Sequence, residues 1–167
     1  MNRVMNRLLK IVACSGLSVL VAAAAAGQSL VMQKTLSLGL AKTIAEAALA
    51  ECKSKGFTTS VVVVDRAGQV LVMLRDEAAS AQTAEMARRK AYTAKMFRMT
   101  TLDFQTRTLD PKYAPQRDVA DILALGGGVP IQIGDEVIGG VGSSGSSQPQ
   151  DDACAKAGVA KVAALLK

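Results

Sequence analysis

Histidine chemistry is excluded at the outset, because the 167-residue chain contains no histidine. A Ser-His-Asp triad, a Cys-His pair and a histidine-ligated zinc site all need that side chain. The chain also has no Cys-x-x-Cys pair, no Gly-x-Ser-x-Gly nucleophile turn and no phosphate-binding P-loop. Three carboxylates, Asp65, Asp76 and Glu77, lie at the ends of predicted strands, where such residues are common. We therefore predict no catalytic residue and no metal site.

One glycine motif matches the dinucleotide-binding fingerprint Gly-x-Gly-x-x-Gly. It runs from Gly140 to Gly145, between a predicted strand and a predicted helix. The fingerprint also needs a following parallel strand and an acidic residue about 20 residues later, which binds the ribose. No Asp or Glu follows Asp152 in the sequence. We therefore predict that these glycines form a tight strand-to-helix turn and bind no nucleotide.

The N-terminal 27 residues have the order of a secretory signal peptide. Residues 1–10 are short and basic, residues 17–26 form a compact apolar run, and Gly27 follows a row of alanines. We predict cleavage, export to the periplasm or the medium, and a mature domain spanning 28–167 without a stable membrane span. Lipidation at Cys14 is the alternative, and the apolar run that follows this cysteine argues against it.

Residue patterns along the mature chain predict three helices and two hairpins. The order is helix, hairpin, helix, irregular segment, hairpin, helix. Such an order favours an α/β (α+β) fold in which helices pack on an antiparallel sheet, as a single domain. The predicted helices are 37–55, 80–99 and 151 onward. The predicted strands are 58–65, 70–75, 129–133 and 137–142. The irregular segment is expected to contain a short helical piece within 100–117 and helical turns at 118–125.

The charge and the apolar content indicate which partners to expect. The formal charge is +6, but three of the basic residues precede the apolar run of the signal. The remaining excess is too small to predict nucleic-acid binding. The strands of the first hairpin are nearly continuous in apolar residues, so both of their faces are expected to be covered, by helices or by another subunit. Together with the alanine-rich second helix, this predicts a homo-oligomer.

Removal of the signal would leave Cys52 and Cys154 as a pair. Cys52 lies near the end of the first predicted helix and Cys154 near the start of the last, so antiparallel packing of these helices brings the cysteines together. Export makes a disulfide permissible. A bridge would close a loop of about a hundred residues and contribute roughly 4–5 kcal/mol in the chain-entropy model. Two buried free thiols remain the alternative.

Four stretches of sequence occur in the order and spacing of one known family. They are VVVVDRAGQVLVMLRDEAA, ARRKAYTAKMF, GGGVPIQIGDEVIGGVGSSG and QDDACAKAGVAKV. Together they resemble the GlcG/HbpS haem-binding family, over residues 38–166. The resemblance implies a profilin-like antiparallel sheet with packed helices, assembled as a homo-oligomer. Some members bind haem, and haem degradation has been attributed to some of them.

The lack of histidine sets this chain apart from the family pattern. Histidine is the usual iron ligand where haem binding in the family is understood. Other donors in the chain are Tyr92, Tyr113, Cys52, Cys154, Met96 and Met99, each of which also has an ordinary role in a core or on a surface. Haem could also lie in an apolar groove without a protein ligand, its propionates paired with basic residues. The candidate haem contacts are Arg88, Arg89, Tyr92 and Tyr113.

These observations predict an exported, oligomeric haem-binding protein, with haem scavenging or degradation as its role. Without imidazole, haem binding should be weaker than in members that have histidine. Two alternatives do not involve haem: a module that binds or senses another small molecule, and a non-catalytic accessory protein. A visible spectrum recorded after addition of haemin separates the first hypothesis from the other two.

Overall fold

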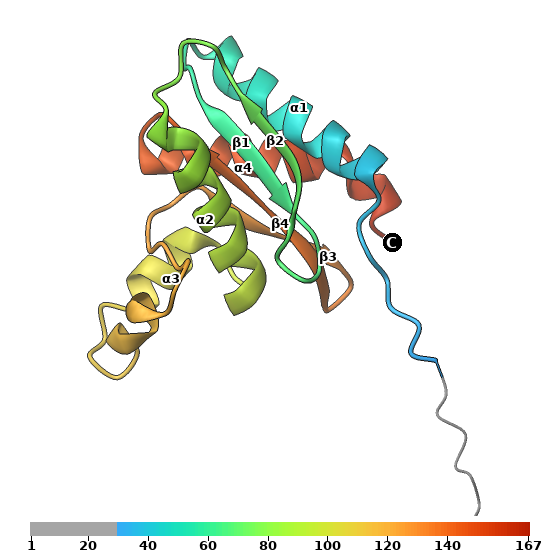
Figure 1. Cartoon of the computed structure of the whole chain (residues 1–167), viewed down its shortest axis with the longest axis vertical. Helices are drawn as coiled ribbons and strands as arrows, with labels where there is room; N and C mark the ends of the chain where they lie inside the picture. Colours follow the sequence, from blue (N-terminus) through green and yellow to red (C-terminus); the bar gives the residue numbers. More distant parts are fainter. Residues whose placement is uncertain (1–29) are drawn as a thin grey trace, which may run out of the picture. The chain divides into compact units, whose positions relative to one another are not determined.

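The computed structural model describes residues 30–167, and the predicted signal peptide and Cys14 lie outside them. The compact unit discussed below is Gln33–Lys167. Its order of helices and hairpins is the predicted one, and the short helical piece predicted within 100–117 is present as an α-helix (Figure 1). The elements are α1 (Leu38–Ser54), β1 (Ser60–Val64), β2 (Val70–Arg75), α2 (Gln82–Phe97), α3 (Thr101–Arg107), the 3-10 helix η1 (Ala114–Asp118), β3 (Gly128–Ile133), β4 (Glu136–Ser144), α4 (Gln148–Lys161) and the 3-10 helix η2 (Ala163–Leu165).

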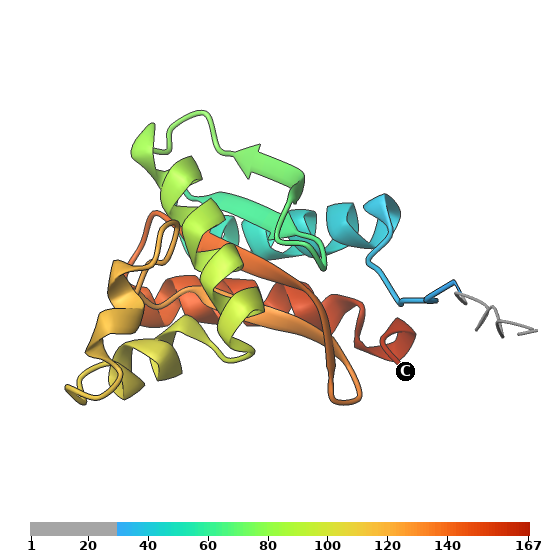
Figure 2. The ribbon, with the colours of Figure 1, turned by 60° about the horizontal axis from the view of Figure 1, so that its bottom comes forward.

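The four strands form one antiparallel sheet in the order β2-β1-β4-β3. Helices α1 and α4 lie side by side on one face, and α2 crosses the other face, as Figure 2 shows. The predicted α+β fold with a single antiparallel sheet is therefore confirmed. Strands β2 and β3 form the two edges of this sheet.

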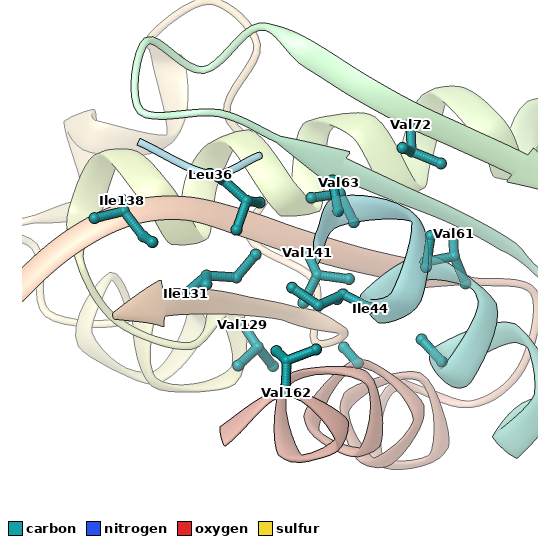
Figure 3. Packing of buried hydrophobic residues seen from close by; sticks show 14 residues of the cluster. Leu36, Ile44, Val61, Val63, Val72, Val129, Ile131, Ile138, Val141 and Val162 are labelled. Carbon is teal, nitrogen blue, oxygen red and sulfur yellow. The ribbon is translucent and has the colours of Figure 1, made fainter. Parts of the chain in front are cut away.

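Most of the core lies between the sheet and the pair α1 and α4. Fourteen buried residues form this cluster, among them Ile44 of α1 and Val61 and Val63 of β1 (Figure 3). Side chains alternate along a strand, so Val62 and Val64 point to the opposite face, where they pack on Ala87 and Ala91 of α2. All of β1 is therefore buried, as its uninterrupted valine run predicts.

Helix α2 approaches the sheet closely because β4 presents glycine to it. A β-carbon on Gly142 would overlap the carbonyl oxygen of Ala87, and one on Gly140 would overlap that of Ala91. The alanines of α2 permit the same approach from the helix side. The Gly140–Gly145 motif is thus a packing surface and a strand end, without the βαβ unit that a dinucleotide site requires.

The prediction of helical turns over 118–125 is wrong. The 3-10 helix η1 ends at Asp118, and the chain beyond it is irregular, with Asp121 at a φ of +68°. Backbone groups that a helix would pair internally are instead bound by α2. The Leu123 amide donates to Thr93 Oγ1 at 2.9 Å, and the Ile122 carbonyl accepts from Arg89. Contacts with α2 thus outweigh the local helical pattern.

Candidate functional site

A disulfide joins the two helices on the main core face. The sulfurs of Cys52 in α1 and Cys154 in α4 are 2.08 Å apart, and their Cα atoms are 5.5 Å apart. Both residues are fully buried. The sequence left open a disulfide or two buried free thiols, and the structure contains the disulfide. Sulfurs joined in this way supply no thiolate to iron, so neither cysteine is a haem donor in this structure.

A buried ion pair connects α2 to the start of α4. Lys90 Nζ lies 2.8 Å from Asp151 Oδ2 and donates to the Ser143 carbonyl at 3.0 Å. Each side chain of the pair is 2% exposed. Asp151 also accepts from the amide and hydroxyl of Ser146, at 3.1 and 2.7 Å. Burial lowers the pKa of Lys90, and the charge of Asp151 opposes that shift.

The sequence did not reveal this role of Lys90. Its neighbours Arg88, Arg89 and Lys95 are also basic, so composition alone does not distinguish Lys90 from them. One signal for the burial of Lys90 was available in the sequence. Lys90 lies three positions after Ala87 and four before Ala94, and residues at these spacings share one face of a helix, here the buried one.

The two arginines proposed as haem contacts hold the irregular segment after η1 onto α2. Arg88 donates to both carboxylate oxygens of Glu85 at 2.7 Å, and to Asp121 Oδ1 at 2.6 Å. These hydrogen bonds raise the pKa of Arg88 further above its usual value. Arg89 donates to the carbonyl of Ile122, and its buried Nε has no hydrogen-bond partner. Both guanidinium groups therefore already have structural partners.

The two tyrosines lie in different surroundings. The ring of Tyr92 packs on Gly68 in the β1–β2 turn, where a β-carbon would lie 2.7 Å from Tyr92 Cε2 and where φ is +82°. Tyr113 precedes η1, with the guanidinium of Arg107 4.3 Å and the ammonium of Lys112 5.4 Å from its ring centre. Within residues 30–167, no hydrogen bond or ion pair joins Tyr113 to Tyr92 or the two arginines.

Apolar side chains gather on the α2 face of β2, where the helix does not cover the sheet. Cross-strand partners point to the same face, and Met73 is paired with Val62, Val70 with Val64. Because these valines pack on α2, Met73 and Val70 lie on that face too, 45% and 43% exposed. Arg75 lies on the same face, since it is two positions after Met73 along the strand.

One stripe of α2 borders this exposed part of the sheet. Tyr92 packs on the turn that leads into β2, whereas Lys90 points the other way, to α4. Residues four apart share a stripe, so Ala84 and Arg88 face the same side as Tyr92. We name this surface the α2 ledge, composed of Val70, Met73, Arg75, Ala84, Arg88 and Tyr92.

Two surface depressions lie elsewhere and are lined by none of the four proposed haem contacts. One, of about 440 Å³, lies against the outer side of α1 and includes Glu46, Glu51 and Lys161. The other, of about 340 Å³, lies beside the β1–β2 turn and includes Asp65 and Arg66. Both are shallow and have charged residues in their lining, and neither includes the exposed Val70 and Met73 of the α2 ledge.

Comparison with known proteins identifies the family. The model of the family described as "Haem degrading protein HbpS-like" matches residues 36–160. The chain belongs to the HbpS-like family. A curated relative from Citrobacter freundii, an uncharacterized 15.0 kDa protein encoded between dhaT and dhaS, is 33% identical over 121 residues, which are 70% of this chain and 84% of the relative.

Solved structures of similar sequence share the fold. HbpS is 34% identical, with a TM-score of 0.77 over 80% of this chain and 94% of HbpS. The protein ORFY of Klebsiella pneumoniae is 26% identical, with a TM-score of 0.75 over 82% and 96% of the two chains. A complex of PduOC with haem is 25% identical, with a TM-score of 0.68 over 75% and 94%.

The donors of this chain fit a haem held by apolar contact and do not fit one held by imidazole. The α2 ledge offers a thioether in Met73, a phenol in Tyr92 and cations in Arg75 and Arg88. Over residues 30–167, no group of three or more Cys, Asp or Glu side chains is arranged to hold a metal ion. The same part of the chain contains no helix with the length and apolar character needed to cross a bilayer.

Proposed function

We propose that this protein is an exported, oligomeric haem-binding protein of the HbpS-like family that holds haem on the α2 ledge. The observation that carries the proposal is the apolar, cation-bordered ledge on a chain whose family includes HbpS and whose structural relatives include a haem complex of PduOC. Haem, when bound, would supply an iron centre for redox chemistry, with scavenging or degradation of haem as the role.

The ledge suits a flat ligand with an apolar body and a charged edge. Val70 and Met73 present exposed apolar surface, each methylene of which contributes about 0.8 kcal/mol when it is buried. Arg75 is exposed at one end of the ledge; its Nη1 donates to the Ala79 carbonyl, which leaves the other N–H groups of the guanidinium for a propionate. Arg88 is already paired with Glu85 and Asp121, so a propionate would have to compete with two carboxylates.

Iron ligation on this surface would be weak. Tyr92 binds ferric iron as the phenolate, so ligation must displace the phenol proton. Met73 needs no deprotonation, but its thioether is a soft donor. Tyr113 lies under Arg107, away from the ledge-forming elements, and contributes no ligand in this arrangement. Affinity therefore comes mainly from apolar contact, below that of relatives with histidine.

A haemin titration followed at the Soret band tests this function. The purified protein should shift the band with saturable, weak binding and without a low-spin spectrum of bis-nitrogen ligation. Met73→Lys should abolish the shift, because it places a charge on the floor of the ledge. Tyr92→Phe should alter the spectrum if its phenolate binds iron, and Tyr113→Phe should behave like the unaltered protein.

Other outcomes would contradict the proposal in distinguishable ways. A tight complex of the untagged protein with the low-spin spectrum of bis-nitrogen ligation would contradict weak binding through apolar contact. Complete absence of binding would favour a module for another small molecule or a non-catalytic accessory protein. Recovery of a different chromophore or small molecule from the native host would decide between those two.

A further inference from the structure

Within residues 30–167, strand β2 leaves one edge of the sheet without a partner strand. Its sequence, VLVMLR, has no charged residue and no proline before Arg75. Its one irregularity, at Leu71, lies near the start, so the stretch from Val72 to Arg75 pairs regularly with β1. Edge strands are ordinarily protected by charge, proline or cover, because their free N–H and C=O groups bind other strands.

The opposite edge of the sheet is protected. Strand β3 contains Pro130, which has no N–H to offer a neighbouring strand, and its exposed residue Gln132 is polar. The two edges thus differ in their capacity to accept another strand. Only β2 combines free backbone groups with adjoining exposed apolar side chains, those of Val70 and Met73.

We propose that two copies of the chain join through β2, edge to edge and antiparallel, about a twofold axis. This inference rests on the homo-oligomeric state proposed above and assigns it a surface. A second copy is the occupant that suits this edge, because the exposed Val70 and Met73 of one copy would adjoin the same apolar side chains of the other. Arg75 is the one charged residue of β2, and antiparallel pairing places the two Arg75 side chains at opposite ends, whereas parallel pairing would bring them together.

Such pairing would complete the proposed ligand site. The sheets of the two copies become continuous, so the α2 ledges lie beside each other on one face. Val70 and Met73 of both copies then form the floor of a trough, and the two α2 helices form its walls. A single copy has only half of this trough, which explains why the ledge of one chain is a surface and not an enclosed cavity.

The mass of the purified protein in solution, measured by sedimentation without haemin, tests the interface. The unaltered chain should be a dimer or a multiple of one, and Met73→Lys should reduce its mass at least twofold. Leu109→Lys, at an apolar residue 71% exposed outside the ledge, and Gln132→Lys, on the β3 edge, should leave the mass unchanged. Far-UV circular dichroism verifies that each variant is folded.

Cross-linking gives a second readout that does not depend on the effect of a buried charge. A short bis-maleimide should join two Met73→Cys chains into a covalent dimer and should not join Leu109→Cys chains, with the unaltered protein as the control for native cysteines. A monomeric unaltered protein, an unchanged mass in Met73→Lys, or equal cross-linking of both cysteine variants would overturn the interface. Haemin binding is scored separately, so its absence from a cross-linked dimer would contradict only the haem function.

Discussion

The two faces of the sheet are closed by different means. Helices α1 and α4 seal one face with a core of fourteen buried residues and a disulfide. Helix α2 covers most of the other face, with α3 beside it at β3. The apolar cluster there contains four residues, and a buried ion pair fixes α2 to α4. The first face supplies the stability of the domain, whereas the second is left open along β2 and carries the surface on which function is proposed.

Loss of the disulfide should have the largest effect on stability. Replacing both Cys52 and Cys154 with alanine frees a loop of 102 residues in the unfolded chain. The chain-entropy model then predicts a loss of about 4–5 kcal/mol in the free energy of unfolding. Urea denaturation of the oxidised protein and the double variant measures it. A difference below about 1 kcal/mol would mean that the sealed face does not depend on the bridge.

Breaking the buried ion pair should destabilise the α2 face almost as strongly. Asp151→Ala leaves the Lys90 ammonium buried without its counter-charge, at a cost of about 3–5 kcal/mol. The double variant Lys90→Met with Asp151→Ala should recover much of that loss, because no buried charge remains. Equal destabilisation in the single and double variants would show that Asp151 acts through Ser146 alone.

Adding one methyl group to β4 should lift α2 from the sheet. The β-carbon of Gly142→Ala would overlap the carbonyl oxygen of Ala87, and overpacking of this kind costs about 1–3 kcal/mol. Gly39→Ala is the matched control, since its β-carbon would have 4.0 Å to the nearest atom and alanine favours α1. Thermal unfolding of the two variants compares them. Equal melting temperatures would contradict the close approach of α2.

An edit of the α2 ledge should affect ligand binding far more than stability. Met73→Lys replaces an exposed side chain, so the free energy of unfolding of the separated chain should change by no more than about 0.5 kcal/mol. Haemin affinity should fall at least tenfold, because the apolar floor is lost. Leu109→Lys provides the control at another exposed apolar residue. Equal losses of affinity in both variants would place the ligand elsewhere.

The smallest expected effect concerns acid stability next to the ledge. Asp76 directly follows β2. The hydrogen bond from the Ala78 amide lowers the pKa of its carboxyl below the usual 3.8, and the Lys53 ammonium adds to this shift, while burial opposes it. The ionised form therefore stabilises the fold above that pH, and the contribution is lost as pH falls through the lowered pKa. Asp76→Asn should flatten the acid limb of a stability profile, and an unchanged limb would contradict this role.

Local patterns predicted most of the fold from the sequence. The signals for α1, β1 and the turn before β2 are local: an apolar stripe, a β-branched run and turn residues, each contained in a short stretch of sequence. The segment after η1 could not be predicted in this way, because Arg89 and Thr93 of α2 decide its conformation from about thirty positions away. Sequence patterns cannot show which distant helix will compete for a backbone group.

The candidate site was predictable only in part. The cysteine pair followed from counting cysteines and placing them at helix ends, and the basic character of α2 followed from its composition. The burial of Lys90 and the partners of Arg88 depend on what packs against the helix, so they were missed. The expectation that β2 is covered on both faces fails within one chain, where Met73 is 45% exposed, and this exposed strand is what points to a second copy.

Methyl NMR with ferric haemin tests most directly whether ligand binds on the open face. The protein is labelled at methionine and alanine methyl groups, and paramagnetic iron broadens the signals of nearby methyls. The Met73 signal on the α2 ledge should broaden first, while Ala47 and Ala50, in the depression beside α1, should stay sharp. Broadening of the two alanine signals with an unaffected Met73 would contradict the account, because it would place haem on the sealed side of the sheet.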